Sequence, residues 1–315
     1  FIQARNRIMP FLQPTPNIKS EALQRILGYA SPIYLKLECN QPTGSFKVRG
    51  AFNALLTLPE GIDRVVAFSS GNFAQAVAYG AAKLRKQAKI VMPKNAPRKK
   101  IEGTRSLGAE IVFCGDKHIE GDALVQKLVE EEGYFALHPF NDYHTIAGQG
   151  TIGLEILETN SSLKHFFCPV GGGGLLSGCA SVLKSHDERI AIYSVEPLGA
   201  HDFFESFQTK KHCSFDKIET IADGLRSPTV GKINYEILMR TVDQAMAISE
   251  EKIIEAMRLL YEHHRLIIEP SGAVALAGFL SLQQNLKGEV VILVTGKNID
   301  EEMFNKLTGV SCGEN

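Results

Sequence analysis

A wound α/β fold with two lobes is the architecture that this sequence predicts. Short apolar runs rich in β-branched or aromatic residues alternate with helix-length segments along its 315 residues. The composition is that of a globular protein, with 44% hydrophobic and 22% charged residues, and the length is sufficient for two buried cores. We find no flexible linker in the sequence, so we expect the lobes to meet at a compact crossing.

Nine apolar runs are predicted to be strands, each followed by a segment of helical character. The last contains Val-Val-Ile-Leu-Val, a pattern typical of a strand that is covered on both faces. The nine runs are Ile33 to Glu38, Val65 to Ser69, Lys89 to Met92, Glu110 to Cys114, Tyr134 to Leu137, His165 to Val170, Ile190 to Val195, Gln244 to Ile248 and Glu289 to Thr295.

The charge balance argues against several classes of partner. Thirty-four basic and 35 acidic side chains give a formal net charge of -1, so nucleic acid and anionic membranes are not expected to bind. No uncharged stretch is long enough to cross a bilayer. The six cysteines form no CxxC pair and are interpreted as reduced thiols. We therefore expect a cytoplasmic protein.

Lys47 is the first candidate for chemistry. It follows Gly44 and Ser45, and Ser45 is predicted to cap a helix that runs through Leu56. A lysine attacks an aldehyde only as the neutral amine, so its reference pKa of about 10.4 must fall, and the positive helix end would favour this. A lysine in a first helical turn is more commonly just solvated. This motif alone leaves both interpretations open.

The loop Ser69-Ser70-Gly71-Asn72 is a candidate anion site. It closes one predicted strand and opens a predicted helix from Phe73 to Leu84, so unpaired backbone N–H groups are available to bind a carboxylate. A routine capped turn explains the same composition equally well.

A second candidate anion site is the run Gly171, Gly172, Gly173 and Gly174, between a predicted strand and a helix that begins near Leu175. Four glycines cost much conformational entropy, which suggests close approach of the backbone to a ligand. Phosphate at the helix N-terminus is favoured over a loose turn. A dinucleotide site is disfavoured because the spacing is not GxGxxG and no acidic residue suitably follows the next strand.

An amine with two anion sites indicates a pyridoxal-phosphate enzyme that acts on an amino acid. Thr295 ends the strongest strand pattern, so its hydroxyl is expected at the ligand-binding edge of the sheet. A neutral hydroxyl facing a pyridine nitrogen would leave the ring a weaker electron sink than a carboxylate would, and would favour prompt loss of a β-substituent. The alternative is a threonine bonded to its own turn.

Glu196 and Asp202 are two carboxylates around a predicted turn. A backbone carbonyl between them could complete an oxygen site for a hard cation. Solvated surface acids are the more frequent reason for such a pair, so the spacing alone supports a metal site only weakly.

Five segments, taken in order, resemble motifs of the fold-type II pyridoxal-phosphate enzymes, in the branch of the serine/threonine dehydratases and serine racemases. The resemblance covers essentially the whole chain and implies a tryptophan synthase β-like fold, with the cofactor in a cleft between two open twisted α/β domains. The five segments are Pro42 to Ala51, Ser69 to Asn72, Pro169 to Leu175, Ile221 to Gly224 and Ile268 to Ala273.

The resemblance also implies roles for single residues. Lys47 would carry the cofactor as an imine, and Ser70 would act on the opposite face of the cofactor. The remaining cofactor contacts would come from Phe46 (ring face), Asn72 (phenolic oxygen), Gly171 to Gly174 with Leu175 (phosphate), Glu269, and Thr295 (ring nitrogen). Ser69, Ser70, Gly71, Asn72 and Phe73 would bind substrate. Glu196, the carbonyl of Ala200 and Asp202 would bind a divalent cation, Mg²⁺, Mn²⁺ or Ca²⁺.

The domains implied are a large one of residues 1–50 and 144–315 and a small one of residues 51–143, in a homodimer. The leading hypothesis for the activity is dehydration of L-serine and L-threonine to pyruvate or 2-oxobutanoate plus ammonia. Serine racemase is the alternative activity. Two remote alternatives are a non-catalytic ligand-binding protein on the same scaffold and a nicotinamide oxidoreductase. Phe73 stands where the family usually has histidine, and no arginine lies between Gly115 and Leu124, which disfavours hydroxyaspartate as substrate.

Overall fold

Two separate sheets organise the computed structural model of the protein, which describes residues 1–69, 71–94, 96, 98–115 and 118–311. The strands are β1 (Asn17–Lys19), β2 (Ile33–Leu37), β3 (Arg64–Phe68), β4 (Gln87–Pro93), β5 (Glu110–Cys114), β6 (Phe135–Ala136), β7 (Leu163–Pro169), β8 (Ala191–Pro197), β9 (Gln244–Ile248) and β10 (Glu289–Val294). The larger sheet has the order β1-β2-β10-β7-β8-β9 and the smaller β5-β4-β3-β6. Apart from the antiparallel β1–β2 pair, the neighbouring strands are parallel.

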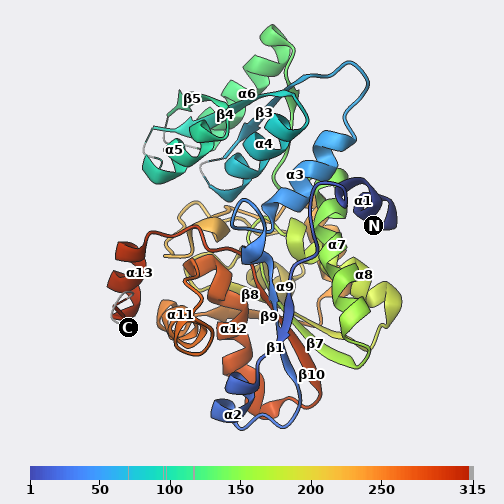
Figure 1. The fold of residues 1–315 in the computed structure, drawn as a ribbon, viewed down its shortest axis with the longest axis vertical. Coiled ribbons are helices and arrows are strands. Elements are labelled where there is room, and N and C mark those ends of the chain that lie inside the picture. The colour runs from blue at the N-terminus through green and yellow to red at the C-terminus, as the bar shows by residue number, and fades with distance from the viewer. Residues whose placement is uncertain (70, 95, 97, 116–117, 312–315) are drawn as a thin grey trace.

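Helices cover both sheets (Figure 1). They are α1 (Ile2–Ile8), α2 (Glu21–Leu27), α3 (Lys47–Leu56), α4 (Asn72–Lys83), α5 (Arg98–Ser106), α6 (His118–Glu132), α7 (Tyr143–Thr159), α8 (Gly174–His186), α9 (Asp202–Thr209), α10 (Lys232–Thr241), α11 (Glu250–His264), α12 (Pro270–Leu282) and α13 (Glu301–Thr308), with short 3-10 helices η1 (Glu38–Asn40), η2 (Asp223–Leu225) and η3 (Gln283–Asn285). No helix in the described ranges is long and apolar enough to span a membrane.

The larger sheet lies between two helical layers. On one face α12 packs against β7, β8, β9 and β10, and α11 packs on α12. On the other face the core contains buried side chains of α7, α8 and α10. Val290, Ile292 and Val294 of β10 point into the first core, Val291 and Leu293 into the second, and all five are fully buried. The prediction of a strand covered on both faces is confirmed.

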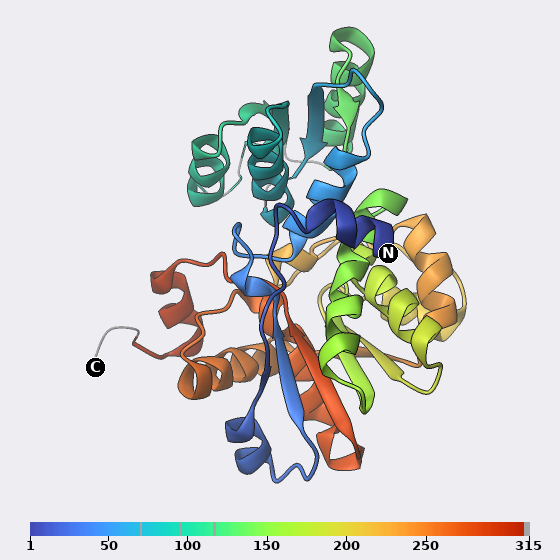
Figure 2. The same cartoon turned by 45° about the vertical axis from the view of Figure 1, so that its right-hand side comes forward.

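The smaller sheet has α4 on one face and α6 on the other, while α5 packs on α4 and β5. Helix α3 belongs to both halves of the molecule, because it packs against α7 on the larger side and α4 on the smaller side. Figure 2 shows it, in light blue, at the junction of the two parts. The fold class is confirmed as two-sheet α/β, and the division at residues 50 and 143 stays a prediction.

All nine predicted strands are present, with differences in detail. The run predicted from Tyr134 to Leu137 pairs only over Phe135–Ala136. The strand β1 was not predicted, because three residues of mixed burial carry no periodic pattern.

The predicted cap at Ser45 is wrong. The helix begins at Lys47 with Phe46 at the N-cap position, and no side chain caps it. The Ser45 hydroxyl is buried and has no hydrogen-bond partner among the described residues. The backbone instead pairs with the loop after β10, through a bridge between Ser45 and Gly296 and a 3.1 Å bond from the Phe46 N–H to the Thr295 carbonyl. The start of α3 is therefore fixed by the end of β10.

Arg49, in the first turn of α3, lies in a buried network of four charged side chains. Its guanidinium donates to the carboxylates of Glu38, at 2.8 Å, and Glu155, at 2.6 Å. Lys36 also donates to Glu155. All four side chains are at most 7% exposed. Two cations and two carboxylates balance, so no net charge is buried, and β2, α3 and α7 are held together.

We predict that Arg49→Met lowers the free energy of unfolding by about 3–5 kcal/mol, because it leaves buried carboxylates without their main partner. Urea unfolding followed by circular dichroism measures the change. Arg5→Ala is the matched control: it removes an ion pair with Glu158 that is 33% and 51% exposed, and should cost less than about 1 kcal/mol. Equal, small losses in both variants would contradict the assignment.

Candidate active site

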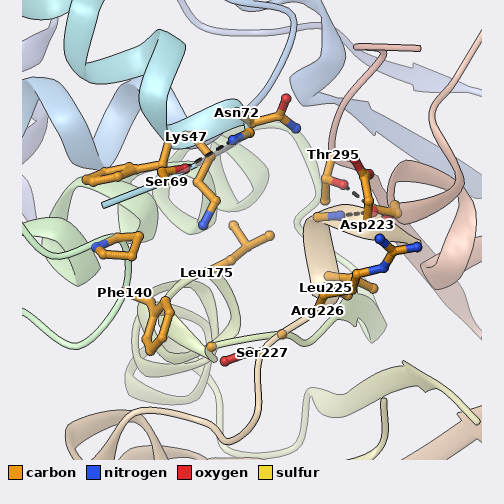
Figure 3. Close-up of a pocket in the computed structure, with 18 of the residues that line it drawn as sticks. Lys47, Ser69, Asn72, Phe140, Leu175, Asp223, Leu225, Arg226, Ser227 and Thr295 are labelled. Atoms are coloured by element: carbon orange, nitrogen blue, oxygen red, sulfur yellow. Dashed lines mark hydrogen bonds between the residues drawn. The ribbon is translucent and has the colours of Figure 1, made fainter. Parts of the chain in front are cut away.

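A cavity of about 440 Å³ lies between the two sheets, at the carboxyl ends of β3, β7 and β10. It brings together each described residue of the predicted cofactor and substrate sets, and Figure 3 shows several of them around it. These residues are Phe46, Lys47, Ser69, Gly71, Asn72, Phe73, Gly171 to Gly174, Leu175, Glu269 and Thr295. Ser70 lies outside the described residues. The assignment of a role to each residue stays a prediction.

Lys47 is the first residue of α3, and its amine points into the cavity (Figure 3). Its Nζ lies 5.1 Å from the ring centroid of Phe46 and 5.9 Å from that of Phe73. Although the residue keeps some exposure to the cavity, its amine lies deep among protein atoms. This burial lowers the pKa of Lys47 to about 8, against the opposing charge of Glu269. Burial, rather than the helix end invoked from the sequence, is the main cause of the shift.

Asn72, the first residue of α4, joins the smaller sheet to the larger part of the molecule. Its Nδ2 donates to Oε1 of Glu269 at 2.6 Å, and its Oδ1 accepts from Nδ2 of Asn298 at 2.8 Å. The other oxygen of Glu269 is buried without a partner in the described structure. Burial and then the nearby Asp223 raise the pKa of Glu269 to about 7. This carboxyl is thus half-protonated near neutrality, and its free oxygen can bind a ligand.

Three glycines of the run from Gly171 to Gly174, namely Gly172, Gly173 and Gly174, each have a local reason to be glycine. Gly173 has φ of 89°, which favours glycine. A Cβ on Gly172 would lie 2.2 Å from the ring of Phe140, and one on Gly174 would lie 3.0 Å from the backbone of Phe140. Close packing against Phe140 is therefore one reason why these positions must be glycine, in addition to any close approach of a ligand to the backbone. No side chain caps α8 at Gly173, so its first N–H groups can bind an anion.

Thr295 follows β10 directly, is 3% exposed and lines the cavity, as predicted for the edge of the sheet. Its Oγ1 donates to the carbonyl of Ser271 at 3.3 Å. This bond is long, and a hydroxyl can rotate to donate to a ligand instead.

The sequence analysis assigned no role to several residues that line the cavity, among them Lys100, Phe140, Asp223 and Arg226. Lys100 and Asp223 form an ion pair across the cavity, and Arg226 donates to the carbonyl of Thr220 at 3.0 and 2.6 Å. Asp223 lies in a segment that resembles a family motif, but no pattern linked it to Lys100, which is 123 residues away.

The acidic pair lies outside the cavity and, unlike surface acids, is buried. Oε1 and Oε2 of Glu196 accept from the N–H groups of Phe203, at 3.1 Å, and Phe204, at 2.6 Å. Oδ2 of Asp202 accepts from the Val230 N–H at 2.6 Å. Burial raises the pKa of Asp202 to about 7, and burial together with Asp202 raises that of Glu196 well above its usual range. Within the described ranges, no cluster of three or more His, Cys, Asp or Glu forms a metal site.

The model of a family of known proteins, described as pyridoxal-phosphate dependent enzyme, matches residues 8–296. The chain belongs to this family. An L-threo-3-hydroxyaspartate ammonia-lyase of a Pseudomonas species is 36% identical to this chain. The alignment covers 97% of this chain and 96% of the relative. A catabolic L-threonine dehydratase of Staphylococcus aureus is 38% identical, over 98% and 90% respectively. The structure of maize serine racemase superposes with a TM-score of 0.92 at 34% identity, covering 97% and 94% of the two chains. The resemblance to fold-type II enzymes is confirmed.

The lowered pKa of Lys47 predicts how this pyridoxal-phosphate-dependent enzyme takes up its cofactor. The apoenzyme reacts through the neutral amine, so the loading rate should rise with pH and reach half its maximum near pH 8. Stopped-flow absorbance at a series of pH values measures it. Glu269→Gln removes a charge that raises the Lys47 pKa, so its profile should shift to lower pH. A rate that still rises above pH 10 would show an ordinary, solvated lysine.

Proposed function

We propose that the protein is a pyridoxal-phosphate-dependent lyase that converts L-serine and L-threonine to pyruvate or 2-oxobutanoate and ammonia. The observation that carries the proposal is the buried amine of Lys47, with its pKa lowered to about 8, in a cavity that faces an uncapped, glycine-rich helix N-terminus. The dehydratase among the relatives supports the choice of reaction.

The cavity residues fit the cofactor by their chemistry. Lys47 supplies the amine that binds its aldehyde, and the ring of Phe46 beside that amine supplies an apolar face. The N–H groups of Gly171 to Gly174 and Leu175 would hold the phosphate. The Thr295 hydroxyl would meet the ring nitrogen and the Asn72 amide the phenolic oxygen, while the unpaired oxygen of Glu269 provides a further acceptor.

The reaction then depends on where protons are held. Bound pyridoxal phosphate withdraws electrons from the amino acid and so acidifies its α-proton. Once the substrate's own amine has displaced it from the cofactor, Lys47 would accept that proton at Nζ, because an amine of pKa about 8 has a substantial neutral fraction near pH 7–8. Thr295 would place no negative charge at the ring nitrogen, which favours prompt departure of the β-hydroxyl. The hydroxyl leaves with one proton as water, so the α-proton and the hydroxyl together account for the water lost. Hydrolysis of the released enamine returns one water and gives the 2-oxo acid and ammonia.

Serine racemase is the second candidate function. Inversion needs an acid or base on each face of the α-carbon, and Ser69 and Gly71, the neighbours of Ser70 in the sequence, line the cavity together with Lys47. Ser70 is the candidate for the second face. The structural similarity to maize serine racemase supports this alternative.

Lys47→Ala should abolish both the visible absorbance of the bound cofactor and 2-oxo acid release from L-serine and L-threonine. The matched control Lys287→Ala removes an exposed lysine and should keep both. Retention of oxo acid release by Lys47→Ala would overturn the proposal. Chiral analysis of the same incubations separates the two functions: D-serine as the main product would favour racemase, and Ser70→Ala should then reduce inversion more than elimination. The panel includes 3-hydroxyaspartate, because of the Pseudomonas relative.

We further propose that Glu196, the Ala200 carbonyl and Asp202 bind Mg²⁺, Mn²⁺ or Ca²⁺. Burial disfavours the charged form of both carboxylates, and Asp202 disfavours that of Glu196 further, so a cation between them would offset the cost of burying their charges. All three residues are at most 2% exposed, so a bound ion would be shielded from solvent.

We also propose that the protein is a cytoplasmic homodimer, as the family resemblance implies.

Adding Mg²⁺, Mn²⁺ or Ca²⁺ to chelator-treated protein at pH 8 should raise the melting temperature, because an ion that binds only the native state stabilises it by mass action. The gain should shrink below pH 7, where Asp202 takes up a proton. Asp202→Asn should remove it, whereas Asp216→Asn, at an exposed carboxylate, should not. No shift with any of the three ions would exclude the site.

A further inference from the structure

The ion pair between Lys100 and Asp223 has no role in the chemistry described above. Lys100 lies in the first turn of α5, on the smaller sheet's side, and Asp223 opens η2, which packs on α12 of the larger side. The Lys100 side chain is 13% exposed and that of Asp223 is 32% exposed. Both line the cavity (Figure 3 labels Asp223), so the pair closes one wall of the space where an amino acid would bind.

Two helix N-termini oppose the positive charge of Lys100, and its direct ion-pair partner is Asp223. Its Nζ lies 3.8 Å from where a Cβ on Gly71 would be, at the uncapped N-terminus of α4. The first turn of α5 contains no acidic residue either. Both helix N-termini carry positive partial charge and repel an ammonium group. The direct ion pair with Asp223, together with the charge of the nearby Glu269, therefore holds the amine at this place.

Asp223 is held by the larger side of the molecule. The adjacent Gly224 N–H donates to Oγ of Ser271 in α12 at 2.9 Å, and Arg226 bonds back to the Thr220 carbonyl. Helix α5, by contrast, packs on α4 and β5 of the smaller side. The ion pair thus fixes α5 and α4 relative to an anchored point, and with α4 the residues Gly71 and Asn72 at its start.

We propose that Lys100 is a positioning residue for substrate: by pairing with Asp223 across the cavity, it holds Gly71 and Asn72, at the start of α4, at the distance that binds the amino acid carboxylate. This inference rests on the proposed function only in its assumption that an amino acid occupies the cavity. Its effect is on substrate affinity, because neither Lys100 nor Asp223 is needed to hold or transfer the α-proton.

The test is a charge exchange. Lys100→Met and Asp223→Asn should each raise KM for L-serine about fivefold or more, the range for loss of one partly buried ion pair, with kcat changed much less. The double variant Lys100→Asp with Asp223→Lys should restore KM to within about threefold of the wild type. Arg98→Met is the control on the same helix, because its pair with Glu102 is exposed and stays within α5. It should leave KM unchanged.

Two readouts do not depend on turnover. The dissociation constant for L-alanine, which has no β-hydroxyl to lose, can be followed by the absorbance of the bound cofactor and should rise in the single variants. Hydrogen exchange of the apoenzyme should be faster in the first turn of α4 and in α5 of Lys100→Met. These measurements test the role of Lys100 even if the wild type releases no oxo acid. That result would overturn the proposed lyase activity but not the inference about Lys100.

An unchanged KM and dissociation constant in Lys100→Met would overturn the inference. A second result would also overturn it: both single variants bind the amino acid more weakly, but the charge-exchanged double variant does not restore binding. The effect would then come from each residue separately rather than from their pairing.

Discussion

The buried network of Arg49, Glu38, Glu155 and Lys36 is the interaction on which the active site depends most. Arg49 is only two residues beyond Lys47 in α3, and its guanidinium bonds both to the segment after β2 and to α7. The helix turn that carries Lys47 is therefore held by charges that do not line the cavity. Such a network stabilises little in net terms, because its desolvation opposes the Coulomb attraction, but it tolerates few alternative arrangements.

The cavity itself combines charges whose effects oppose each other. Burial lowers the pKa of Lys47 and raises that of Glu269, while each of the two groups partly counters the shift of the other. Both values come to lie within about one unit of neutral pH, where either group can gain or lose a proton. Burial of a lysine and a glutamate at one site is thus enough to shift both pKa values into the range suited to proton transfer.

Much of the fold could be predicted from the sequence, because strands covered on both faces, such as β10, leave near-continuous apolar runs. The cavity-lining loops could also be located, since parallel strands bring their carboxyl ends to one edge. Other features depend on contacts distant in sequence. The start of α3 is set by pairing of Ser45 with Gly296, so the local cap rule failed there. The packing of Phe140 against Gly172 and the pairing of Lys100 with Asp223 likewise leave no local pattern. The short strand β1 exists only because β2 is there to pair with it.

The shared packing of α3 has a consequence for any closing motion. This helix touches α7 on one side and α4 on the other, and it begins at Lys47. If the smaller sheet rotates about this junction, each atom on the smaller side moves by an amount proportional to its distance from the rotation axis. The reactive amine, next to the pivot, would stay almost still, whereas α5 would sweep through a longer arc. The enzyme can then admit and enclose a ligand without disturbing the atom that must be placed most accurately.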